Sequence, residues 1–172
     1  DVDGDGDPDL YVSTRGGPPV AIEQAIMGGT AGDGGLYIPD ALPQFSPGDF
    51  PRDAGFAATA TRFLAPFFAG SSLADRLPGI CQAALDFPVP LRRLEEGSGS
   101  AGSLAVLELF HGPTAAFKDV GARFLAHSME QIIRDGVYAT APVTVLVATS
   151  GDTGGAVASA YHRRPGTRVV VL

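Results

Sequence analysis

The sequence of 172 residues contains only one cysteine, Cys81, and one lysine, Lys118. A single cysteine cannot form an internal disulfide, which excludes a disulfide-stapled fold and suits a reducing compartment such as the cytoplasm. Cys81 also lies far in the sequence from all three histidines, so we interpret it as a packing residue. No stretch approaches the roughly 20 apolar residues that span a bilayer, and no signal peptide is evident. We therefore expect no membrane partner.

Excess positive charge is also lacking, because the formal net charge is −7. Nucleic-acid binding needs clustered Lys and Arg, so the sequence argues against a nucleic-acid partner. Five of the negative charges belong to Asp1, Asp3, Asp5, Asp7 and Asp9, and the rest of the chain carries a charge near −2. Bulk charge therefore does not identify a substrate. An apolar content of 45% excludes a chain that is disordered throughout.

The first half of the chain is divided by glycine and proline. Between residues 15 and 55 their spacing predicts only short helices and turns. Apolar residues at helical spacing predict helices over residues 20–27 and 56–68. Pro66 disfavours helical geometry in the residue before it, so the second helix is expected to kink or to end at Leu64.

The second half has an alternating pattern of strands and helices. We predict strands over residues 104–110, 143–148 and 168–172, and helices over residues 120–133 and 155–161. Asp135-Gly136 should end the first of these helices. The β-branched run at 143–148 is typical of a strand buried on both faces. This order predicts an α/β fold with a parallel βαβαβ sheet.

These patterns divide the chain into three parts. Residues 1–10 form an acidic tail of uncertain origin, and residues 11–97 form a mostly helical N-terminal lobe. Residues 98–172, which open with a Gly/Ser-rich surface loop, form the start of a parallel-sheet domain. Because the last residues lie on a predicted core strand, we expect a truncated domain from a longer protein.

Ligands of open α/β sheets bind at strand ends, and a small-residue turn follows the strand at 143–148. It contains Ser150, Gly151, Asp152, Thr153 and Gly154. Backbone N–H groups at the start of the next helix could bind a carboxylate or phosphate there. The alternative is a simple helix cap, with Asp152 or Thr153 as the capping residue.

Lys118 ends the segment ELFHGPTAAFK, just before the strongest predicted helix. The helix dipole disfavours a cation in the first turn, so this placement suggests a functional reason. A lysine amine can form a Schiff base with a carbonyl cofactor. The alternative is a solvated lysine with no chemical role.

Four segments together resemble the threonine synthase family: YVSTRGG at 11–17, DGGLYIP at 33–39, ELFHGPTAAFKDVGA at 108–122 and TSGDTGG at 149–155. The resemblance extends from about Tyr11 to Leu172. It implies a tryptophan-synthase β-like fold type and a pyridoxal 5'-phosphate enzyme that converts O-phosphohomoserine and water into threonine and phosphate.

The resemblance also implies roles for single residues. Lys118 would carry the cofactor and move protons, and the turn at 150–154 would receive the substrate carboxylate. His111 and Thr114 would either line the site or only shape the loop. Asp152 stands where many relatives have Asn, and its contact is left unassigned. The family's cofactor-phosphate loop would lie beyond Leu172, so we expect residues 1–172 to be inactive alone.

The first nine residues, DVDGDGDPD, do not fit this family. Alternating carboxylates with glycines at turns are typical of Ca²⁺ loops, so Asp1, Asp3, Asp5, Asp7 and Asp9 are candidate metal ligands. An acidic tail and a fusion artefact remain as other interpretations. Two alternative functions also stay open: a threonine-synthase-like phospholyase, and a non-catalytic calcium-binding module. The sequence makes no prediction of oligomeric state.

Overall fold

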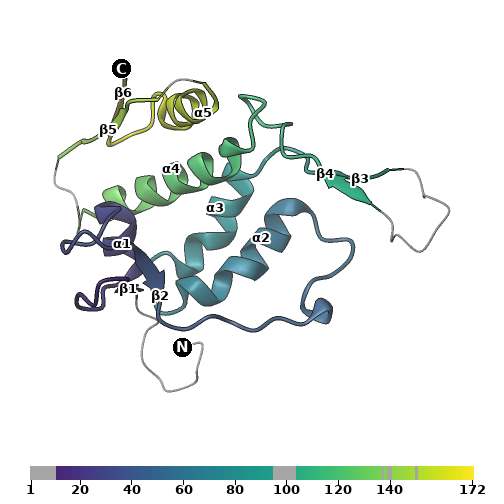
Figure 1. The fold of residues 1–172 in the computed structure, drawn as a ribbon, viewed down its shortest axis with the longest axis horizontal. Coiled ribbons are helices and arrows are strands. Elements are labelled where there is room, and N and C mark those ends of the chain that lie inside the picture. Colours follow the sequence, from purple (N-terminus) through teal and green to yellow (C-terminus); the bar gives the residue numbers. More distant parts are fainter. Residues whose placement is uncertain (1–10, 95–103, 137, 139–140, 150) are drawn as a thin grey trace.

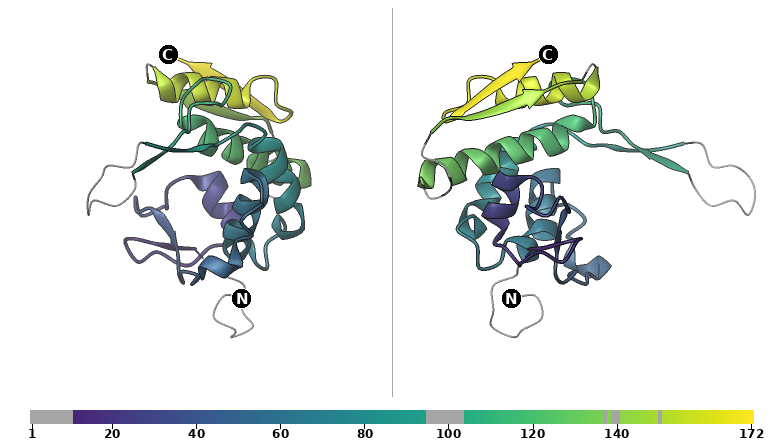
Figure 2. Two further views of the ribbon diagram at one scale, coloured as in Figure 1. Left: turned by 90° about the vertical axis from the view of Figure 1, so that its right-hand side faces the viewer. Right: turned by 60° about the vertical axis from the view of Figure 1, so that its left-hand side comes forward.

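The structure, a computed structural model, describes residues 11–94, 104–136, 138, 141–149 and 151–172. Helix α4 (Lys118–Asp135) runs through the middle of the molecule. Helices α1 (Ile22–Gly28) and α3 (Leu77–Ala84) pack on one side of it. Helix α5 (Asp152–Tyr161) and strands β5 (Val143–Val147) and β6 (Thr167–Val171) lie on the other side (Figures 1 and 2).

Helix α4 joins two hydrophobic clusters because it carries apolar residues on two faces. Ile132 packs in a cluster with Phe68, Leu77 and Ile80 from the N-terminal helices. Ala126 and Met129 pack against Ala160 and Tyr161 of α5. The predicted helix over 120–133 is confirmed, and it ends at Gly136, whose φ of 71° gives the expected left-handed cap.

Helices make up most of the regular secondary structure in the N-terminal half, as predicted. Helix α2 (Phe56–Leu64) ends where Pro66 predicts, and the chain continues as the 3₁₀ turn η2 (Ala65–Phe68). Two further 3₁₀ turns are η1 (Pro47–Asp49) and η3 (Ala74–Arg76). Helix α3 was not predicted, although Leu77, Ile80, Cys81 and Ala84 form its buried stripe. Cys81 has no exposed surface, which confirms its packing role, and burial raises the pKa of its thiol.

Strands β1 (Tyr11–Ser13) and β2 (Tyr37–Pro39) form an antiparallel pair that the sequence did not predict. Asp33 ties the loops around this pair together. Its carboxylate accepts hydrogen bonds from the Gly35 amide (2.8 Å), the Ser13 hydroxyl (2.8 Å) and the Gly17 amide (3.0 Å). The bond from Gly35, followed by that from Ser13, lowers the pKa of this carboxyl. The segments YVSTRGG and DGGLYIP therefore fold as one structural unit.

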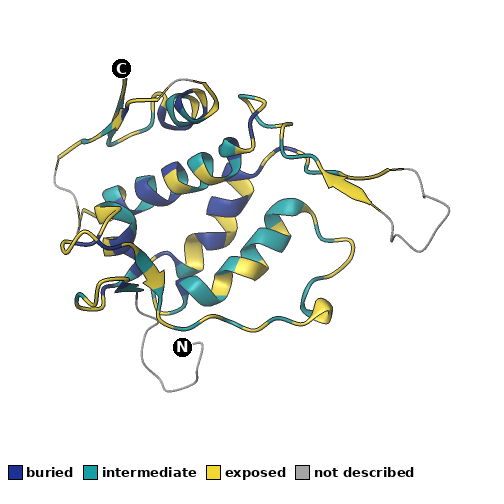
Figure 3. Ribbon diagram, in the orientation of Figure 1, coloured by how far each residue is buried: buried dark blue, intermediate teal, exposed yellow. Residues whose placement is uncertain are grey.

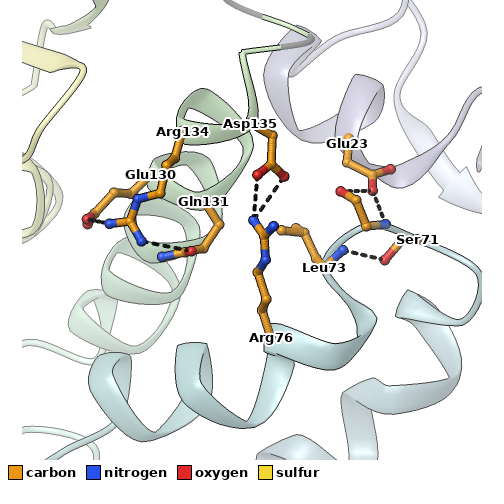
Figure 4. A network of polar contacts seen from close by, with 9 residues as sticks. Glu23, Ser71, Leu73, Arg76, Glu130, Gln131, Arg134 and Asp135 are labelled. Atoms are coloured by element: carbon orange, nitrogen blue, oxygen red, sulfur yellow. Dashed lines mark hydrogen bonds and ion pairs between the residues drawn. The ribbon is translucent and has the colours of Figure 1, made fainter.

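Polar contacts also join the N-terminal helices to their neighbours (Figure 4). Glu23 is almost fully buried in α1, and its carboxylate accepts bonds from the amide and hydroxyl of Ser72, both at 2.7 Å. Arg76 donates to both carboxylate oxygens of Asp135, at 2.8 and 2.9 Å, at the far end of α4. Figure 4 shows these two residues facing each other across the gap between the helices.

The strand pairing confirms the α/β class but corrects one part of the predicted sheet. Strands β5 and β6 are parallel, with Val145 opposite Val169, and α5 connects them. Strand β4 (Ala105–Leu107) does not join them, so its predicted parallel pairing is wrong. It pairs antiparallel with β3 (Leu91–Arg93), which is nearer in sequence. This hairpin extends away from the helices, and both of its strands are exposed (Figures 2 and 3).

The expected burial of β5 on both faces is also wrong for the described residues. Val147 is buried, but Leu146 is 63% exposed, because α5 packs on only one face of the β5–β6 pair. A buried two-sided strand needs a covering layer on each face. None of the described residues supplies the second layer over Leu146.

Candidate active site at the start of helix α4

Lys118 is the first residue of α4, and its side chain lines a cavity of about 600 Å³ between α4 and α5. The Nζ atom lies 4.6 Å from the centre of the Phe117 ring, an ordinary distance for a cation–π contact. Among the residues that line this cavity, Lys118 is the only charged one and Thr153 is the only other polar one. The remaining wall is apolar: Phe56, Leu109, Phe117, Val120, Gly121, Ala122, Leu125 and Val157.

Gly121, one turn after Lys118, keeps part of this cavity open. A Cβ atom at this position would meet no atom within 4 Å. Gly121 also lines a second apolar cavity of about 580 Å³, together with Phe50, Phe63 and Phe124. Phe56 and Val120, like Gly121, line both cavities, so the two cavities adjoin each other at these residues. Glycine inside a helix is unfavourable by itself, and space for a ligand is one reason to keep it.

The loop before Lys118 is tied to the helix by Asp119. The Asp119 side chain has no exposed surface. Its carboxylate oxygens accept one bond from the Thr114 amide and one from the Thr114 hydroxyl, each at 2.8 Å. Ala115, which lies between Thr114 and Asp119 in the sequence, has a φ of 56°, which non-glycine residues seldom adopt. The Thr114 hydroxyl is thus engaged in the loop, and a role in substrate binding stays a prediction.

His111 lies in the same loop but is absent from the wall of the Lys118 cavity. Its Nε2 atom is 2.7 Å from a carboxylate oxygen of Glu108, and its ring packs on Phe110. Arg92 of the β3–β4 hairpin lies 3.8 Å from the same carboxylate. The structure therefore pairs His111 with Glu108, next to Arg92 of the hairpin, and the predicted substrate contact of His111 is untested.

The second predicted segment forms the turn that leads into α5. Gly151 precedes the helix with a φ of 80°, a conformation that favours glycine. Gly154 is buried, and a Cβ there would lie only 2.5 Å from the Thr149 carbonyl oxygen. Asp152 is the first residue of α5 and is exposed, whereas Thr153 reaches the Lys118 cavity. Ser150 falls outside the described residues.

Lys118 and the turn before α5, which are about 30 residues apart in sequence, thus meet at one cavity. The first N–H groups of α5 have no acceptor within the helix, which makes its start suited to a negatively charged group. Sequence reasoning missed Phe56 and Gly121 as parts of this wall. The glycine inside an otherwise strong helical pattern was the one available signal for Gly121. Phe56 comes from α2, and only the tertiary fold brings it here.

Other expectations concern metals and membranes. The candidate calcium ligands Asp1, Asp3, Asp5, Asp7 and Asp9 lie outside the described residues. Within the part of the chain that is described, no group of three or more His, Cys, Asp or Glu side chains could hold a metal ion. The helices in that part are all too short or too polar to cross a membrane.

Comparison with known proteins adds independent findings. The family model "Threonine synthase N terminus" matches residues 10–85. Threonine synthase from Escherichia coli is 38% identical over 155 residues, which are 89% of this chain and 34% of the relative. The chain superposes on the crystal structure of PLP-bound threonine synthase from Brucella melitensis with a TM-score of 0.81, at 35% identity. That match covers 95% of this chain and 35% of the Brucella protein.

The yeast threonine synthase structure gives a similar result, with a TM-score of 0.82 at 30% identity over 94% of this chain. It shares less sequence than the bacterial structure but has the same fold over this region. The chain spans about a third of the length of the relatives and structures it matches.

Proposed function

The chain is a homologue of the N-terminal third of threonine synthases, and from this premise we propose that it supplies the cofactor-carrying lysine of such an enzyme. The proposed reaction converts O-phosphohomoserine and water into threonine and phosphate, with pyridoxal 5'-phosphate as cofactor. The observation that carries the proposal is the position of Lys118, the sole lysine, on a cavity that also receives Thr153 from the start of α5.

The residues around the cavity fit this cofactor. A primary amine is what pyridoxal phosphate needs for covalent attachment, and Lys118 offers the only side-chain amine in the chain. Gly121 leaves open space beside it, since a Cβ there would contact nothing. When bound, pyridoxal phosphate acts as an electron sink for negative charge that develops next to the substrate's amino group.

Each part of the wall has a separate task in this proposal. Lys118 binds the cofactor and, once the substrate amine has replaced it, holds and moves protons at Nζ. The backbone N–H groups at the start of α5 bind the substrate carboxylate, and the predicted substrate-binding residues 150–154 belong to this segment. Phe56, Val120 and Val157 exclude water from the region around Nζ, which protects the covalent attachment from hydrolysis.

The activity is proposed for the full-length protein. The relatives are about three times as long as this chain, and the Lys118 cavity supplies one amine and one anion-binding turn. Holding the cofactor firmly needs several anchors at once. We therefore propose that residues 1–172 alone neither retain pyridoxal phosphate nor release phosphate from O-phosphohomoserine.

The test is phosphate release from O-phosphohomoserine by the full-length protein, its Lys118→Ala variant and the isolated 172-residue chain. We expect release and threonine formation only from the first. An Arg164→Lys variant is a useful control, because it introduces a second lysine into the 172-residue chain at a position away from the cavity wall. Full activity of Lys118→Ala, or of the isolated chain, would contradict the proposal. Phosphate release without threonine would instead favour a related phospholyase.

We also propose that the chain divides near residue 97, into an N-terminal lobe (11–97) and the first part of a cofactor domain (98–172), with residues 1–10 as a separate tail. The two larger parts share a core, because Ile132 and Phe124 of the second part pack on Phe68 of the first. A protein split between residues 97 and 98 should therefore copurify as two associated fragments. Separation of the fragments under native conditions would refute a shared core.

The single buried thiol of Cys81 supports a reducing compartment, and we propose the cytoplasm. Fractionation of the cells that produce the protein tests this, and recovery in an oxidising compartment would contradict it.

A further inference from the structure

We propose that Asp119 is a positioning residue for Lys118: its buried carboxylate fixes the loop from Gly112 to Phe117 and thereby the point from which the lysine side chain starts. The inference rests on the proposed function, in which Lys118 carries the cofactor. It concerns a residue that does not itself touch the reacting atoms. Asp119 is not among the residues that line the Lys118 cavity.

The first observation is the burial and bonding of the Asp119 carboxylate. The side chain has no exposed surface, yet no arginine, lysine or histidine is paired with it among the described ion pairs. Its two oxygens are instead bonded to one residue, Thr114, through the amide to Oδ2 and the hydroxyl to Oδ1, each at 2.8 Å. Removing a carboxylate from water costs free energy, and the two bonds from Thr114 offset this cost for Asp119.

The second observation is how closely the loop packs on this carboxylate. A Cβ added to Gly112 would lie 2.5 Å from Asp119 Oδ2 and 2.8 Å from its Cβ. Glycine at 112 therefore allows the backbone to lie directly against the aspartate. The loop closes with bonds from the Ala115 amide to the Gly112 carbonyl and from the Asp119 amide to the Ala116 carbonyl, both at 3.1 Å.

The third observation is that Lys118 has little else to position it. Its side chain has four rotatable bonds, and the neighbouring wall is almost entirely apolar. The one contact of Nζ that the structure describes is with the Phe117 ring, which is 55% exposed. The position of Lys118 must therefore be fixed by the backbone on both sides of it. Asp119 anchors that backbone to Thr114.

The test uses the full-length protein and four variants. Asp119→Asn removes the charge and replaces one of the two accepting oxygens by an NH₂ donor, and Thr114→Val removes the hydroxyl while leaving the amide bond. Thr114→Ser restores the hydroxyl and is the conservative rescue. Asp135→Asn is the matched control, because it changes an aspartate in the same helix at the end away from the loop.

Two readouts separate positioning from general folding. Hydrogen exchange of residues 112–117 in the cofactor-free protein should rise at least about tenfold in Asp119→Asn and Thr114→Val, with no change in the later turns of α4. Turnover should fall by about 10- to 100-fold in kcat, with KM within about twofold, because a displaced reacting group lowers the rate more than it lowers binding. Thr114→Ser and Asp135→Asn should match the wild type in both.

Normal exchange and normal kcat in Thr114→Val and in a folded Asp119→Asn would overturn the inference. If Asp119→Asn fails to fold, Thr114→Val alone decides, since it removes one bond and leaves the carboxylate in place. A wild-type protein that carries no cofactor on Lys118 would overturn the proposed function itself. That failure is recognised in the wild type, before any variant is compared.

Discussion

His127 should make the stability of the protein depend on pH between about pH 5 and pH 7. It lies in the middle of α4 and is partly buried. Burial, followed by the positive charges of Arg164 and Arg123, lowers its pKa from 6.5 to about 4, while Glu130 and Asp86 act weakly in the opposite direction. The folded protein therefore keeps His127 neutral under conditions in which the unfolded chain binds a proton.

The sign of the effect follows from this difference. A depressed histidine pKa contributes stability that is fully present above 6.5 and is lost as the pH falls toward 4. The full shift corresponds to roughly 3 kcal/mol, and about 2 kcal/mol of it lies between pH 7 and pH 5. Because the side chain is only partly buried, solvent screening reduces the expected loss over that interval to about 1 kcal/mol.

Urea denaturation at several pH values measures this loss directly. The His127→Gln variant supplies the background from all other titrating groups, and the difference between the two curves isolates His127. We expect the wild type to lose about 1 kcal/mol more than the variant on going from pH 7 to pH 5. Parallel curves, or a variant that loses more stability than the wild type, would refute the assigned burial and charge environment.

Three further predictions concern single residues. The buried, pKa-raised thiol of Cys81 should not react with a thiol reagent such as DTNB until the protein is unfolded, and rapid labelling of the native protein would contradict its burial. Gly154→Ala should destabilise the protein by about 1–3 kcal/mol in urea titrations, since the new Cβ would meet the Thr149 carbonyl oxygen; an unchanged midpoint would show that the turn yields freely. Gly121→Ala should instead raise the unfolding free energy by about 0.5–1 kcal/mol, because alanine is more favourable than glycine within a helix and the new Cβ would meet no other atom. A loss of stability would show that the space beside Gly121 is filled.

The parts of the fold that the sequence predicted are those with a strong local signal. Helix α4 has apolar residues at helical spacing over many turns and a glycine cap at 136, and its course was predicted closely. Pro66 predicted the end of α2 for a steric reason that acts within one residue. Helix α3 was missed because Pro78 and Gly79 near its start resemble the punctuation of a turn, although both are tolerated there.

Strand pairing was harder to predict because it depends on contacts between distant residues. The apolar run around Val106 identified a strand correctly, but nothing in that run states which partner it takes. The pairing with Leu91–Arg93 was missed because that strand is three residues long and contains two arginines. The same limit applied to β1 and β2, which are equally short.

In the candidate site, too, the features with a local sequence signal were predicted and those that depend on distant contacts were not. Lys118 and the turn before α5 were found because each combines an unusual residue with a strand or helix end. The support for Lys118 from Asp119 was not predicted, because a carboxylate next to a lysine looks like an ordinary surface pair until its burial is known. Thr153 and Phe56 meet at the cavity through packing between α2, α4 and α5, which no local pattern encodes.

Covalent trapping is the decisive measurement of whether Lys118 carries the cofactor. The full-length protein, loaded with pyridoxal 5'-phosphate, is reduced with borohydride, digested and analysed by mass spectrometry. We expect a pyridoxyl group on the peptide that contains Phe117, Lys118 and Asp119, and its loss in a Lys118→Arg variant. A pyridoxyl group on a different lysine of the full-length protein, with Lys118 unlabelled, would contradict the claim.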